Sequence, residues 1–128
     1  MYDEPSAAEI QNAGERIAAA ALDTARLIAA ERLQELLGPA AADPVATVEA
    51  FLARDASSHP KYDVLRAFEQ RWALLTIRLL EPTMNPAAAI RDARSRGVTV
   101  QQVAAALKIR PQTVYSRYGD DILLSRDG

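Results

Sequence analysis

The sequence predicts an all-α protein with a long first helix, and three observations lead to this fold class. Apolar residues recur at three- and four-residue steps along most of the 128-residue chain, and proline and glycine separate these stretches. Alanine, the strongest helix former, occurs 26 times, whereas aromatic residues make up only 5% of the chain. No segment shows the convincing polar and apolar alternation of a strand.

The first predicted helix covers residues 7–37. Ser6 is a good N-cap with a glutamate three residues later, and Gly38 is a typical stop. At about 1.5 Å per residue, such a helix is roughly 45 Å long, which exceeds what so small a domain needs internally. We expect its smooth, alanine-rich surface to pair with a second copy of the chain. The alternative is an ordinary core helix that breaks near Gly14 or Thr24.

Two further helices complete a predicted helical assembly domain over residues 1–84. Asp43 and Pro44 cap and open a helix over 45–54. The third helix, over 60–80, carries the strongest apolar stripe of the sequence, formed by Leu65, Phe68, Trp72, Leu75 and Leu79. We interpret this stripe as core because no convergent polar set accompanies it, and we predict no small-molecule effector.

Residues 85–119 are predicted to form a smaller trihelical module. Its first helix starts at Asn85 and Pro86 and stops at Gly97. Thr99 has a glutamine three residues later, which is the spacing of a capping box for the second helix. After a three-residue corner, a proline that suits the first turn opens the third helix. The remaining residues, 120–128, are assigned to an acidic tail.

Positive charge is concentrated in this C-terminal module. Residues 86–118 carry six cations and one carboxylate, a net charge of +5. Residues 1–85 carry eight cations and thirteen carboxylates (−5), and residues 119–128 carry one and three (−2). Frequent use of arginine, thirteen against two lysines, does not explain why carboxylates are missing from one stretch. The distribution favours contact with a phosphate backbone.

The segment 98–118, VTVQQVAAALKIRPQTVYSRY, resembles the helix-turn-helix superfamily of bacterial and phage transcription regulators. Val103, Ala104 and Ile109 occupy the usual core positions of that motif. IRPQTV is similar to lactose-repressor-type proteins, and TVYSRY is similar to the recognition helix of sigma-factor region 4. The resemblance covers about a quarter of the chain.

The resemblance implies that the helix over 111–118 enters a DNA major groove and that a homodimer reads an inverted repeat with half-sites about 10 bp apart. Paired hydrogen bonds from glutamine suit adenine, and arginine suits phosphate or guanine. The predicted base-reading residues are Gln112, Thr113 and Ser116. The predicted phosphate contacts are Arg94, Arg96, Thr99, Lys108, Arg110, Tyr115 and Arg117.

Two residues depart from the family pattern. Lys108 stands at the corner where glycine is usual, and a left-handed conformation there costs on the order of 1 kcal/mol. This departure predicts a distorted turn. Arg117 stands where many repressors have an apolar residue. The resemblance therefore does not rank Tyr115, Ser116 and Arg117 as DNA contacts.

The main alternative is a helical protein-interaction adaptor, such as an antitoxin or a transcription-factor antagonist, that uses the same fold. A full sigma factor is disfavoured because the chain has no basic, aromatic-rich segment for melting promoter DNA. We also expect no enzyme, metal or cofactor. The chain has no cysteine, its single histidine, His59, has no partner at ligand spacing, and Glu31 and Glu35 fit a solvated face.

No segment is apolar enough to predict a membrane span or a secretory leader, since the first residues are acidic. We therefore expect a cytoplasmic protein that does not bind membranes.

Overall fold

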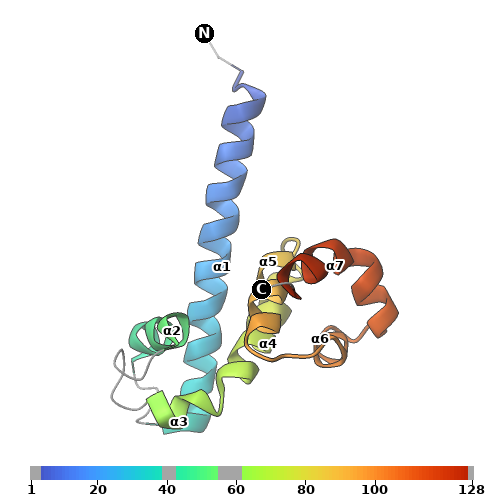
Figure 1. Ribbon diagram of the computed structural model, residues 1–128. Helices are drawn as coiled ribbons and strands as arrows, with labels where there is room; N and C mark the ends of the chain where they lie inside the picture. The colour runs from blue at the N-terminus through green and yellow to red at the C-terminus, as the bar shows by residue number, and fades with distance from the viewer. Residues whose placement is uncertain (1–3, 39–42, 55–61, 127–128) are drawn as a thin grey trace.

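A computed structural model describes residues 4–38, 43–54 and 62–126, with side chains described up to Gly119 except that of Leu37. This part of the chain is all-helical, as predicted (Figure 1). The helices are α1 (Ala7–Leu37), α2 (Pro44–Ala53), α3 (Tyr62–Arg66), α4 (Glu69–Leu80), α5 (Ala87–Ser95), α6 (Val100–Leu107) and α7 (Pro111–Arg126).

The long helix α1 has the predicted bounds and is not broken at Gly14 or Thr24. Ser6 caps it by accepting a hydrogen bond of 3.1 Å from the amide of Glu9. Only its C-terminal half packs into the molecule, where it contacts α2 and α4. Every residue from Glu4 to Ile17 is exposed, and the N-terminal half projects as a free rod (Figure 1).

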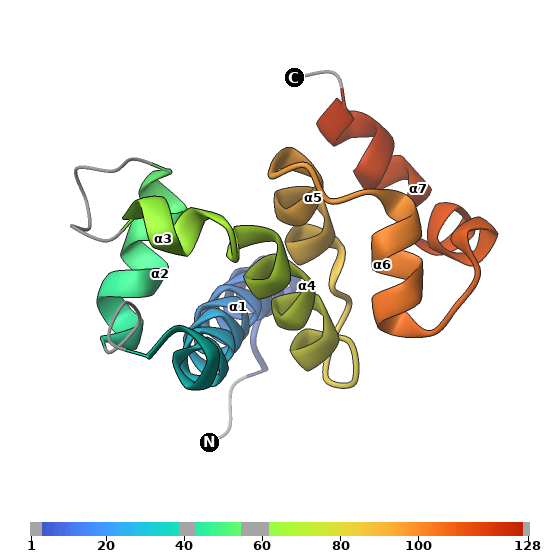
Figure 2. The ribbon, with the colours of Figure 1, turned by 90° about the horizontal axis from the view of Figure 1, so that it is seen from below.

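Helix α4 connects the two halves of the molecule because it contacts α1, α5 and α6 (Figure 2). Its Trp72 is fully buried, and the indole nitrogen donates to the carbonyl of Arg26 in α1 at 3.0 Å. The Trp72 ring lies 4.8 Å from the ring of Phe51 in α2. One continuous hydrophobic core therefore runs past residue 84, where we predict a domain boundary.

The single helix predicted over 60–80 is wrong, because the chain forms α3 and α4 with a turn at Ala67 and Phe68. The amide of Phe68 donates to the carbonyl of Leu65 at 2.8 Å, and its carbonyl starts α4 by accepting from the amide of Trp72 at 2.9 Å. The turn contains no proline or glycine, so hydrophobic periodicity alone does not reveal it. His59 lies outside the described residues.

Helix α7 is longer than predicted. It continues to Arg126, so the backbone of residues 120–126, which we assign to an acidic tail, is part of the same helix. The second helix, Pro44–Ala53, lies within one residue of the prediction and is capped by Asp43.

Among the described helices, none combines the length and the apolar character that crossing a bilayer requires.

Candidate nucleic-acid interface

Helices α5, α6 and α7 form the C-terminal unit, in which α7 packs against both of the others. Its interior is built from Ile90, Val98, Val103 and Val114, all fully buried. Of the predicted core positions, Val103 and Ala104 are buried and Ile109 is half-buried. The capping box at Thr99 is confirmed by two reciprocal hydrogen bonds with Gln102, of 2.8 and 3.1 Å.

The corner between α6 and α7 centres on Lys108. Its backbone lies in the left-handed region, with φ 59° and ψ 42°, close to the ideal values for that region. The amide of Ile109 donates to the carbonyl of Ala104 at 3.0 Å, and the carbonyl of Arg110 accepts from the amides of Thr113 and Val114 at 2.9 and 3.2 Å. The predicted distortion is therefore wrong, because Lys108 adopts the conformation that glycine usually supplies.

We expect Lys108→Gly to raise the free energy of unfolding by up to about 1 kcal/mol, since glycine has no Cβ to strain in this conformation. Urea unfolding measures the gain. Lys108→Ala is the matched control, because it removes the same charge and keeps the Cβ. Equal stability of the two variants would contradict the explanation.

The three predicted base-reading residues share one face of α7. At 100° per residue, Gln112, Thr113 and Ser116 lie opposite the buried Val114 and Tyr118. Gln112 and Ser116 are exposed and Thr113 is half-buried. The Ser116 hydroxyl donates to the carbonyl of Thr113 at 3.1 Å, which leaves its oxygen able to accept from a ligand. This face presents a donor and acceptor surface to solvent.

Polar and cationic groups flank this face. Tyr115, 47% exposed, lies on one side and Arg117 on the other, and Lys108 and Arg110 are exposed at the start of α7. Thr99 is exposed, and its hydroxyl, which accepts from the capping box, keeps its O–H to donate to a ligand. Five predicted phosphate contacts, Thr99, Lys108, Arg110, Tyr115 and Arg117, are thus available to a ligand through their charged or hydroxyl groups.

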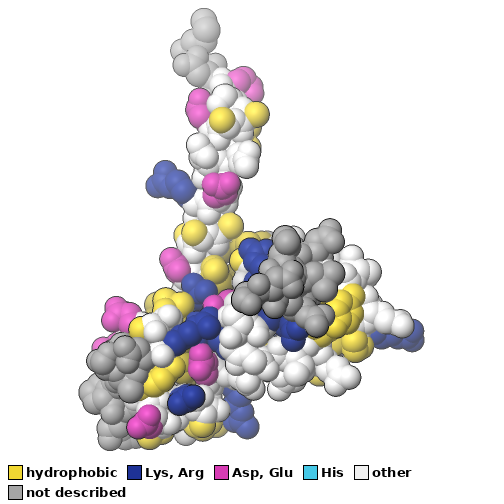
Figure 3. All heavy atoms as spheres, in the orientation of Figure 1, with side chains coloured by type: hydrophobic (Ala, Val, Ile, Leu, Met, Phe, Trp, Pro, Cys, Tyr) yellow, Lys and Arg dark blue, Asp and Glu magenta, His cyan; other side chains and the backbone are white. Residues whose placement is uncertain are grey.

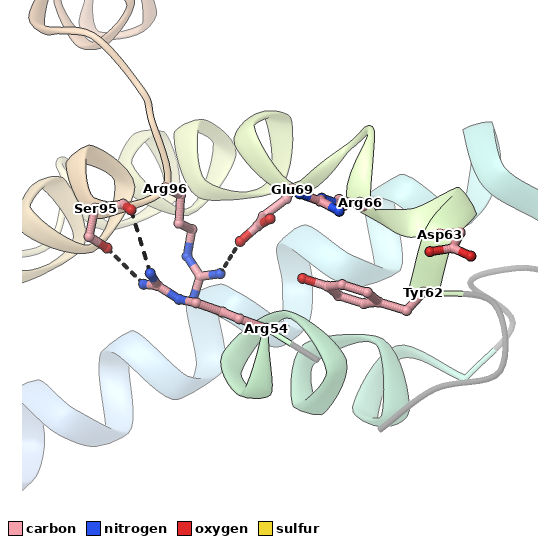
Figure 4. A pocket seen from close by; sticks show the side chains of 7 residues that line it. All are labelled: Arg54, Tyr62, Asp63, Arg66, Glu69, Ser95 and Arg96. Atoms are coloured by element: carbon pink, nitrogen blue, oxygen red, sulfur yellow. Dashed lines mark hydrogen bonds and ion pairs between the residues drawn. The ribbon is translucent and has the colours of Figure 1, made fainter. Parts of the chain in front are cut away.

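The structure places Arg96, a predicted phosphate contact, inside the protein, where its side chain is only 1% exposed. Its guanidinium is held by three groups of the protein, and Figure 4 shows one of them, Glu69. Nε donates to Asp92 at 2.8 Å, and Nη1 donates to the carbonyl of Phe51 at 2.7 Å and to Glu69. The Cζ atom of Arg96 also lies over the ring of Trp72, 5.0 Å from the ring centroid. No sequence signal distinguishes this arginine from Arg110 and Arg117, which are exposed.

Burial alone would lower the pKa of Arg96, but the hydrogen bonds and negative charges of Asp92 and Glu69 outweigh it and raise the pKa. Arg96 therefore stays charged and joins α5 to α2 and α4. Arg54 strengthens the same junction by donating to the Ser95 hydroxyl at 2.7 Å (Figure 4) and to Asp92 at 3.3 Å.

Arg94 is also used within the protein. Its Nη1 donates to the carbonyl of Val98 at 3.1 Å, and its Nε is buried without a hydrogen-bond partner among the described groups. Its half-buried side chain braces the turn between α5 and α6. Of the five cations predicted to contact phosphate, the structure therefore leaves three exposed: Lys108, Arg110 and Arg117.

Within the described ranges, no three His, Cys, Asp or Glu side chains gather as metal ligands do.

No protein-family model, curated protein or solved structure matches the chain.

Proposed function

We propose that the chain is a sequence-specific, double-stranded DNA-binding regulator of transcription that acts in the cytoplasm. In this proposal α6 and α7 act as a helix-turn-helix, and α7 lies in the major groove. The observation that supports it most is the exposed face of Gln112, Thr113 and Ser116, which lies opposite the residues that anchor α7. Three exposed cations, Lys108, Arg110 and Arg117, surround that face.

The chemistry of this face suits base edges better than a protein partner. An amide and two hydroxyls offer both donors and acceptors, which is what the major groove presents. Arg117 on one flank, Tyr115 on the other and the two cations at the corner suit contact with phosphates beside the groove. A single module of this size usually binds weakly, so two copies reading an inverted repeat are the physical expectation.

Fluorescence anisotropy with a random-sequence duplex and with duplexes selected from a random pool tests the proposal. Three exposed cations in each of two chains suggest about six phosphate contacts. We therefore expect affinity to fall by about 10³-fold between about 50 and about 200 mM salt. The selected duplexes should bind more tightly than the random duplex at every salt concentration.

Indifference to duplex DNA at low salt would overturn the proposal and favour the adaptor, whose basic end would then meet an acidic protein. Equal affinity for every duplex would overturn sequence-specific reading alone.

A further inference from the structure

Helix α1 carries an apolar stripe from Ile10 to Ile28 that, apart from the half-buried Ala21, is exposed in the described chain. At 100° per residue, its members fall within one sector of the helix about 100° wide. The side chains of Ile10, Ile17 and Ile28 are 59, 69 and 39% exposed. The apolar stripe consists of Ile10, Ala13, Ile17, Ala20, Ala21, Thr24 and Ile28. Hydrophobic side chains appear along the projecting rod in Figure 3.

The apolar stripe has defined ends. Beyond Ile28, the same face of α1 continues with Glu31 and Glu35, which are both exposed. The stripe is therefore about 27 Å long, from Ile10 to Ile28, and its midpoint is residue 19. The core contacts of α1 use a different face, which carries Ala25, Ala29 and Leu33. A partner can therefore cover the stripe without disturbing the core.

We propose that a second copy of this chain covers the apolar stripe, with its α1 running antiparallel about residue 19. In that register Ile17 lies beside Ala20 of the second copy, and Thr24 lies beside Ala13. At the centre of the pair, large side chains then meet small ones, so the two helices can approach closely there. In a parallel pair in register, alanine would face alanine and isoleucine would face isoleucine, which leaves gaps in alternate layers.

Charge complementarity favours the same orientation. Arg16 and Asp23 lie on one flank of the apolar stripe, seven residues apart. Reversing one helix about residue 19 brings Arg16 of each copy beside Asp23 of the other, and so forms two ion pairs. In the parallel pair the flank of Arg16 meets Gly14 and Ala21 of the other copy, which carry no charge.

A groove at the inner end of the apolar stripe fits the end of the second helix. It is lined by Ile17, Ala21 and Ile28 of α1 together with Leu79 of α4 and Thr83 in the turn that follows it. The antiparallel register brings Ile10 of the second copy to the Ile28 end of the stripe. We infer that this isoleucine covers the Ile28 end of the groove, so that the end of each projecting helix lies against α4 of the other copy.

The sequence has no cysteine, so single introduced cysteines report the orientation under mild oxidation. Ile10→Cys alone should stay uncrosslinked, because the two copies of residue 10 lie about 27 Å apart. A mixture of Ile10→Cys and Ile28→Cys chains should give a disulfide-linked dimer on a non-reducing gel. Efficient crosslinking of Ile10→Cys alone, or none in the mixture, would overturn the antiparallel register.

Sedimentation equilibrium tests the surface itself. We expect twice the chain mass for the wild type, and we expect Ala20→Asp to raise the dimer dissociation constant by about 100-fold or more, because two carboxylates would meet apolar surface. Ala19→Asp is the matched control, since it makes the same change at an exposed neighbour outside the apolar stripe. Equal effects of the two variants, or a monomeric wild type, would overturn the proposal.

Circular dichroism checks that both variants stay helical. We expect them to, because Ala19 and Ala20 are exposed in the single chain. The crosslinking and mass measurements use no DNA. The dimer and the DNA-binding proposal can therefore fail independently.

Discussion

Replacing Arg96 with methionine should lower the free energy of unfolding by about 3 kcal/mol. The side chain is only 1% exposed and serves Asp92, Glu69 and the carbonyl of Phe51 at once. Removing one member of a buried ion pair costs about 3–5 kcal/mol, since the other charge stays without a partner. We expect the lower end, because Asp92 also pairs with Arg54 and both carboxylates keep some exposure.

Arg78→Met is the matched control, because Arg78 is exposed on α4 and the chemical change is the same. Its effect should stay within about 0.5 kcal/mol. Urea denaturation monitored by Trp72 fluorescence reports both variants, since that ring lies against Arg96.

A double-mutant cycle separates the network from simple loss of packing. Glu69→Gln should cost less in the Arg96→Met background than in the wild type, because the substitution then removes a charge that has already lost its partner. Wild-type stability of Arg96→Met together with weakened DNA binding would contradict the structural role and restore Arg96 to the phosphate contacts.

The elements predicted correctly are those whose signals are local. Ser6, Asp43 and Thr99 cap helices within three residues of themselves, and a cap depends on little beyond its own turn. The apolar spacing in α6 and the start of α7 likewise fixes which residues face inward. Consequently Val103 and Val114 are buried and Gln112 is exposed, as the sequence predicts.

The features that were missed depend on distant contacts. Arg96 looks like its neighbours in sequence, and only the fold brings it to Glu69 of α4 and Phe51 of α2. The turn at Phe68 contains no helix breaker, so packing decides where α3 ends. Lys108 shows a third limit, since a propensity penalty of about 1 kcal/mol is small enough for the surrounding fold to override it.

Substitutions of Gln112 and Arg117 on α7 should have different effects, because we expect one residue to read a base and the other to bind phosphate. Gln112→Ala should relax discrimination at one base pair by about 1–3 kcal/mol and change binding to other positions little, because a paired hydrogen bond to one base is lost. Selection of bound fragments from random DNA, repeated with the variant, locates the position that is relaxed.

Arg117→Ala should instead weaken binding to all duplexes by a similar factor and reduce the slope of log affinity against log salt by about 2, because each chain of the dimer loses one phosphate contact. The matched controls are Gln34→Ala and Arg32→Ala, the same changes at exposed positions of α1. Both controls should leave affinity and the salt slope unchanged, since α1 lies outside the proposed interface.

The two outcomes together test the orientation of α7 in the groove. Helix geometry puts Gln112 on the face of α7 opposite Val114, and it puts Arg117 beside that face. When this face enters the major groove, the phosphates at the edge of the groove therefore come close to Arg117. If Arg117→Ala relaxed one base pair while Gln112→Ala weakened all sequences equally, α7 would have to be rotated by a large fraction of a turn. That rotation would expose Val114, which is fully buried, so it would require a different packing of the C-terminal unit.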